Sequence, residues 1–153
     1  MKDLQNVLEK MGILSLTVVV LSGCGPNAEE IRATKVLAIC DEANTAMSAL
    51  SSSSFTPVPS ADWEKIGNTY AEISSKLQTL SSQASELEES QLSRDFSSVS
   101  NNLGEIQAVA ALAKRIGASE VYNDYWFPAV AKLLDNSALR GSSNRTFVEC
   151  KSN

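Results

Sequence analysis

The sequence predicts an all-α protein: an up-down-up-down four-helix bundle behind an N-terminal signal helix. Apolar residues recur every three or four positions through most of residues 28–135, the spacing that places them on one face of a helix. Breaks at residues 51–60 and at Gly117 divide this pattern, and no alternating pattern predicts strands. Short connections between helices favour antiparallel neighbours and therefore a bundle.

Residues 1–23 are organised as a signal peptide. Residues 1–10 are polar, and residues 11–21 form an apolar run without a charged side chain. A helix that crosses a bilayer needs about 20 apolar residues, so this run is too short to span one. We therefore expect a segment that is removed from the mature protein.

The segment ends in Leu21-Ser22-Gly23-Cys24. These four residues resemble the lipobox of bacterial lipoproteins, in which a leucine-like residue and two small residues precede the cysteine. The resemblance implies cleavage between Gly23 and Cys24, and attachment of diacylglycerol and fatty chains such as palmitate to the mature protein at Cys24. Two or more such chains hold a protein stably on a membrane. The alternatives are an ordinary secretory signal or an uncleaved segment.

The expected location is the cell envelope, on the outer side of the cytoplasmic membrane or at the outer membrane. In the lipoproteins that this segment resembles, Asp after the lipidated cysteine favours retention at the inner membrane. Here that residue is Gly25, which favours the outer membrane in an organism that has two. Residues 24–27 form only a short lipidated tether, so we expect the domain to lie close to the bilayer.

The first helix is expected over about residues 28–50. Asn27 and Glu30 have the spacing of a capping box, which marks a helix start. The apolar residues of this segment share one face, which includes Cys40. They are Ala33, Val36, Cys40, Ala43, Met47 and Leu50.

The second helix is expected over about residues 60–88, after a loop at 51–60. The loop contains four consecutive serines and two prolines, and Ser60 is placed to cap the helix. The apolar positions then step by three and four without interruption, as in helices packed nearly parallel or antiparallel. They are Trp63, Ile66, Tyr70, Ile73, Leu77, Leu80, Ala84 and Leu87.

The third helix is expected over about residues 92–116. The apolar pattern slips between Leu87 and Leu92, which are five residues apart. An unbroken helix over residues 60–116 would be about 85 Å long, out of scale for so small a domain. We therefore expect a turn within residues 88–93, although no glycine or proline marks it.

The fourth helix is expected over about residues 119–135. Gly117 is placed to end the preceding helix and Ser119 to cap this one. Pro128 must kink or divide it, because proline lacks an N–H and clashes with the preceding turn. Residues 136–153 are expected to form a loose polar tail.

Three cysteines suit a lipidated protein. With Cys24 assigned to lipid, Cys40 and Cys150 remain as an even pair in an oxidising compartment. We expect them to form a disulfide that ties the C-terminal tail to the bundle. The alternative is a buried free thiol at Cys40 and a loose thiol at Cys150.

Composition excludes several classes of function. The chain has no histidine, which removes the commonest general base and metal ligand and every Ser-His or Cys-His nucleophile. Its net charge of −5 argues against nucleic-acid binding. The serines match no nucleophile motif and are interpreted as polar faces and loops. We expect no enzymatic activity, no cofactor and no metal.

Two clusters deserve separate interpretations. Glu86, Glu88 and Glu89 form an acidic group that suits weak Ca²⁺ binding through carboxylate oxygens, but a solvated helix end is the simpler interpretation. The aromatic group at Tyr122, Tyr125, Trp126 and Phe127 is the strongest candidate for function. On a regular helix its first three members share a face with Ala129, which would plug one end of the core. Alternatively, some of these rings stay exposed as anchors for a partner.

The expected function is that of a membrane-anchored envelope lipoprotein with a non-enzymatic helical domain. Such a domain would work by contact with another envelope protein or with the cell wall. The alternative is a binder of a small apolar ligand or lipid within the bundle. Replacing Trp126 with alanine separates a core role, which lowers stability, from a contact role, which lowers partner capture alone.

Overall fold

The computed structural model describes residues 27–50, 52–57, 60–140 and 145–151. This part of the chain is an all-α helical bundle, as the sequence predicts. Within it, no helix combines the length and apolar character that crossing a membrane requires. The expected signal segment and Cys24, the expected lipidation site, lie outside the described residues.

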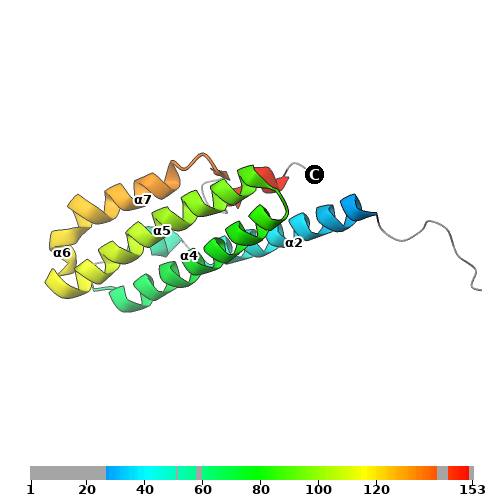
Figure 1. The fold of residues 1–153 in the computed structure, drawn as a ribbon. Helices are drawn as coiled ribbons and strands as arrows, with labels where there is room; N and C mark the ends of the chain where they lie inside the picture. The colour runs from blue at the N-terminus through cyan, green and yellow to red at the C-terminus, as the bar shows by residue number, and fades with distance from the viewer. Residues whose placement is uncertain (1–26, 51, 58–59, 141–144, 152–153) are drawn as a thin grey trace, which may run out of the picture.

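Helix α2 (Ala28–Ser48) begins at the capping box that the sequence predicts. The Asn27 side chain accepts from the Glu30 N–H at 2.8 Å, and the Glu30 carboxylate accepts from the Asn27 N–H at 2.9 Å. Only the C-terminal half of the helix is buried, from Ile39 onward. The expected seam is therefore wrong at Ala33, which is exposed, because the N-terminal half of α2 extends beyond the other helices of the bundle (Figure 1).

The expected loop at 51–60 contains a short helix, α3 (Ser52–Phe55), and α4 spans Trp63–Glu86. The cap of α4 is Asp62 rather than Ser60, because the Asp62 carboxylate accepts from the Lys65 N–H at 3.0 Å. A carboxylate also interacts more favourably than a hydroxyl with the positive end of the helix dipole.

The turn before α5 (Ser90–Ile116) is shorter than expected and lies at Leu87–Glu89. Glu88 takes a left-handed backbone conformation, with φ of 61°. The N–H of Glu89 donates to the carbonyl of Ala84 and that of Glu88 to Ser85, at 2.9 and 3.0 Å. These two bonds form a Schellman motif, so Glu88 occupies the position that glycine usually fills.

The fourth helical segment is not one regular helix. It comprises α6 (Ala118–Val121), the π-helical turn η1 (Tyr122–Trp126) and α7 (Phe127–Leu134). Gly117 ends α5, with φ of 106°, and the new segment begins at Ala118, so Ser119 is not its cap. Pro128 lies in the first turn of α7, directly after the π turn. A π turn is wider than an α turn, which leaves room for the ring that would otherwise clash.

The tail is more ordered than the sequence indicates. Strand β1 (Leu139–Arg140) pairs antiparallel with β2 (Thr146–Phe147), and a 3₁₀ turn, η2, follows at Glu149–Lys151. The expectation of no strand is therefore wrong for these four residues. Phe147 is 0% exposed and meets Phe96 edge to face, with ring centroids 4.6 Å apart. This buried ring holds the tail in place.

Helices α4 and α5 lie side by side along their length, with α7 on α5 and α2 on α4 (Figure 1). Serines join α4 to α5. The Ser100 hydroxyl donates to the carbonyl of Ser74 at 2.8 Å, and the Ser81 hydroxyl donates to that of Ser93 at 2.8 Å. Ser81 and Ser100 are buried, so these serines are not merely polar surface. Small hydroxylated side chains allow the two helices to approach closely while their polar atoms stay satisfied.

Candidate functional site

Trp126 belongs to the core and is not available to a partner. Its ring is 0% exposed and meets Trp63 and Tyr70 edge to face, with centroids 5.1 and 5.9 Å apart. Its indole N–H donates to the carbonyl of Phe55 at 2.9 Å. Trp126 thus closes one end of the bundle and fastens α3 to it.

The aromatic neighbours of Trp126 differ in exposure, and not in the way that a regular helix predicts. Tyr125 is 52% exposed and Phe127 is 43% exposed, whereas Tyr122 is half-buried. The Tyr122 and Phe127 rings meet edge to face at 4.9 Å. Tyr125 and Trp126 both lie in the π turn η1, in which Trp126 is buried and Tyr125 is exposed. The expected common face of Tyr122, Tyr125 and Trp126 is therefore wrong.

Exposed apolar and acidic side chains gather on the segment 118–135, and we call this set the outer face. From the sequence we predict only its aromatic part, because that prediction rests on the aromatic cluster and does not include Leu134. The spacing of Leu134 from Phe127 by seven residues would have revealed it. The outer face comprises Glu120, Asp124, Tyr125, Phe127, Leu134 and Asp135.

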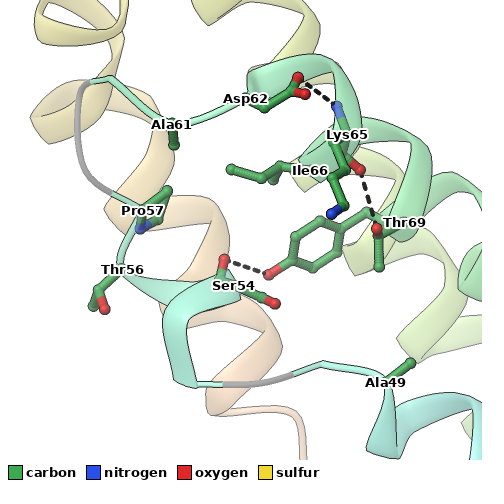
Figure 2. A pocket seen from close by; sticks show the side chains of 10 residues that line it. Ala49, Ser54, Thr56, Pro57, Ala61, Asp62, Lys65, Ile66 and Thr69 are labelled. Carbon is green, nitrogen blue, oxygen red and sulfur yellow. Dashed lines mark hydrogen bonds between the residues drawn. The ribbon is translucent and has the colours of Figure 1, made fainter.

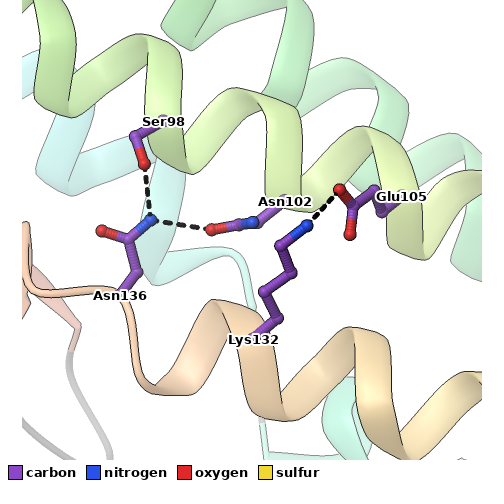
Figure 3. Close-up of polar contacts among 5 residues, drawn as sticks. All are labelled: Ser98, Asn102, Glu105, Lys132 and Asn136. Carbon is purple, nitrogen blue, oxygen red and sulfur yellow. Dashed lines mark hydrogen bonds and ion pairs between the residues drawn. The ribbon is translucent and has the colours of Figure 1, made fainter.

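Polar contacts hold the C-terminal end of α7 against α5 (Figure 3). The Asn136 amide N–H group donates to Ser98 Oγ at 3.0 Å and to Asn102 Oδ1 at 2.7 Å, and Asn102 is buried. Lys132 forms an ion pair with Glu105 of α5. These contacts fix the end of α7, so the outer face is carried on a rigid element.

A separate open hollow of about 480 Å³ lies beside α3 and the start of α4 (Figure 2). Tyr70 is one of the residues that line it, and its hydroxyl donates to the carbonyl of Ser54 at 2.9 Å. Burial raises the pKa of Tyr70 far above its ordinary value, and the nearby charge of Arg145 only partly opposes this. Burial therefore favours the neutral phenol of Tyr70 over its ionised form.

The acidic group Glu86, Glu88 and Glu89 lies at the end of α4 and in the turn before α5. Glu89 forms an ion pair with Arg32 of α2 at 2.8 Å, and Glu88 occupies the left-handed position of the turn. In the described ranges, no three His, Cys, Asp or Glu side chains are grouped in a way that could hold a metal ion.

A disulfide joins Cys40 to Cys150, as expected, with Cα atoms 5.3 Å apart. Cys40 is 4% exposed and lies on the buried half of α2. Nearby, the N–H of Phe147 donates to the side chain of Asn44 at 3.0 Å. The disulfide and this bond attach the tail to α2, which is a structural role.

Comparison with known proteins adds no relative. No protein-family model matches the chain. No curated protein and no solved structure matches it significantly either.

Proposed function

We propose that this protein is a bacterial envelope lipoprotein, held at a membrane by lipid on Cys24, whose helical domain binds another envelope protein or the cell wall. The observation that carries the proposal is Leu21-Ser22-Gly23-Cys24 after an apolar run too short to span a bilayer. Gly25 favours placement at the outer membrane where there is one. The domain then works by contact rather than by catalysis.

The arrangement of the bundle supports this proposal. Helix α2 begins at Ala28, four residues after Cys24, so a lipid there would attach beside the free end of α2. The α6 end of the bundle lies at the opposite end of the molecule (Figure 1). The anchor and the exposed aromatic rings at Tyr125 and Phe127 would thus be far apart, which leaves those rings accessible above the membrane.

A non-enzymatic role is supported by what the buried polar groups do. Ser81, Ser100 and Asn102 are buried, and each makes a hydrogen bond that joins two helical segments. Buried polar groups that are satisfied in this way stabilise packing and are not poised for proton transfer. The burial of these three side chains is therefore accounted for by helix packing and does not require a substrate.

The alternative, an apolar ligand within the bundle, has less support. Positions at the centre of the core are filled by large side chains, since Tyr70, Phe96 and Trp126 are each 0% exposed. An apolar ligand needs a cavity lined by such groups and not occupied by them. Native mass spectrometry of the purified protein tests this alternative: we expect no retained small molecule, and a stoichiometric adduct besides the anchor would favour it.

The anchor is tested by growing cells that produce the full chain with an alkyne-tagged fatty acid. We expect the tag on the wild-type protein, and its loss together with release from the membrane fraction in Cys24→Ala. Cys150→Ala is the matched control, because it removes a sulfur outside the lipobox and should leave labelling unchanged. Label that persists in Cys24→Ala, or its absence from the wild type, would contradict the proposal.

A further inference from the structure

The outer face has an apolar part that no described residue covers. Tyr125, Phe127 and Leu134 are 52%, 43% and 36% exposed. Phe127 and Leu134 are seven residues apart in one helix and so lie on the same side of α7, with exposed Ala131 between them. Aromatic side chains are enriched at protein interfaces and dominate their energetics.

The same segment carries three exposed acidic side chains. Glu120, Asp124 and Asp135 are all exposed. The only basic residue of α6, η1 and α7 is Lys132, and its charge is neutralised by Glu105. Arg145 acts electrostatically on Asp135, whereas Glu120 and Asp124 have no ion-pair partner among the described residues. The outer face therefore combines exposed rings with two carboxylates, Glu120 and Asp124, that no described ion pair compensates.

We propose that the outer face docks a basic amphipathic segment of an envelope protein, with lysine or arginine side chains beside apolar ones. Opposite charge across an interface speeds association and excludes acidic partners. Cations also interact favourably with the faces of exposed aromatic rings, here Tyr125 and Phe127. This inference rests on the proposed function and adds to it the chemistry of the partner.

A lipid surface fits the outer face less well than a protein does. Anionic headgroups are repelled by carboxylates such as Glu120 and Asp124. The α6 end also lies opposite the start of α2, which is the part of the bundle nearest to Cys24 in sequence (Figure 1). A partner that meets the outer face would therefore stand away from the membrane that holds the lipid.

The test places the photo-crosslinker p-benzoylphenylalanine at position 127 of the full chain in membranes of the producing cell. The crosslinked peptide is sequenced by mass spectrometry. We expect it to come from an envelope protein and to carry more Lys and Arg than Asp and Glu. The matched control carries the crosslinker in place of Leu37, which is 45% exposed on α2.

Charge is tested in the same experiment with Glu120→Lys and Asp124→Lys combined. We expect the crosslinking yield at position 127 to fall about tenfold, a size typical of lost complementary charges at an interface. It should also fall as salt rises. Circular dichroism and oxidised Cys40–Cys150 verify that the variant is folded, so a fall in yield reports on docking.

Several outcomes would overturn the inference. They are a neutral or acidic crosslinked peptide, an adduct with lipid or glycan only, an equal yield of the same peptide from position 37, and a yield that charge reversal leaves unchanged. Fatty-acid labelling at Cys24 is read independently. Normal labelling with partner capture at position 37 alone would leave the proposed function standing while removing the outer face from it.

Discussion

The indole N–H of Trp126 donates to the carbonyl of Phe55, 71 residues earlier in the chain, at 2.9 Å. Phe55 in turn lies beneath the guanidinium of Arg145, which is 5.5 Å from the ring centroid and donates to the carbonyl of Leu134. Trp126 and Phe55 together thus connect the serine-rich loop, the last helical segment and the tail. Removal of Trp126 should affect the whole domain.

Trp126→Ala should lower the free energy of unfolding by about 3–5 kcal/mol, because it leaves a large cavity and an unpaired Phe55 carbonyl. Tyr125→Ala is the matched control, since its side chain is half exposed, and should change stability by less than about 0.5 kcal/mol. Urea unfolding followed by far-ultraviolet circular dichroism measures both. Equal losses would contradict the burial that separates these neighbours.

The second prediction concerns the disulfide, which closes a loop over a sequence separation of 110. Replacing both Cys40 and Cys150 with alanine should lower the free energy of unfolding by about 2–5 kcal/mol, mainly because the unfolded chain gains freedom. Thermal unfolding with and without a reductant provides the check. Reductant should lower the thermal unfolding midpoint of the wild type and leave that of the double variant unchanged. A shift in both proteins would show that the reductant acts on something other than this disulfide.

The third prediction concerns the turn between α4 and α5. Glu88→Gly should stabilise the protein by about 0.5–1 kcal/mol, because a left-handed backbone costs energy for a residue with a Cβ and little for glycine. Glu86→Gly is the control: it lies at the end of α4, inside the helix, and should destabilise by up to about 1 kcal/mol. Opposite signs in chemical denaturation are the expected result, and the same sign in both would refute the turn geometry.

The fourth prediction concerns Asp95. Partial burial raises the pKa of this carboxyl above its ordinary value, and Glu149 adds to the shift, while the bond from Gln91 and the charge of Arg94 oppose it. A raised pKa in the folded state means that the ionised form is disfavoured by folding. Folding stability is therefore reduced above the folded pKa, and this loss disappears as the pH falls through the folded pKa towards the unfolded value.

Asp95→Asn should consequently be more stable than the wild type at pH 7. Its advantage should shrink as the pH is lowered into the range where Asp95 titrates. The measurement is the difference between the two unfolding curves across a pH series, which cancels the other carboxylates. An advantage that stays constant with pH would point to a cause other than charge.

Features that depend on neighbours in sequence were predictable. The capping box at Asn27 and Glu30, the stop at Gly117 and the seam of α4 follow from local spacing, because helix periodicity and capping operate within a few residues. The pairing of Cys40 with Cys150 followed from counting once Cys24 was assigned to lipid. The proposed function also depends on the sequence alone, through the resemblance of Leu21-Ser22-Gly23-Cys24 to a lipobox.

Only the tertiary structure decided the rest, because each outcome depends on groups distant in the chain. Pro128 predicted a kink or a break in the last helix. The burial of Trp126 and the exposure of Tyr125 in the π turn depend instead on the space between Trp63 and Tyr70, which the Trp126 ring fills. Two residues, Leu139–Arg140, are too few to give a strand pattern in the sequence. They form a strand because they pair with Thr146–Phe147, whose Phe147 is buried in the core. Side chains alternate between core and surface according to these long-range contacts, and spacing alone does not specify them.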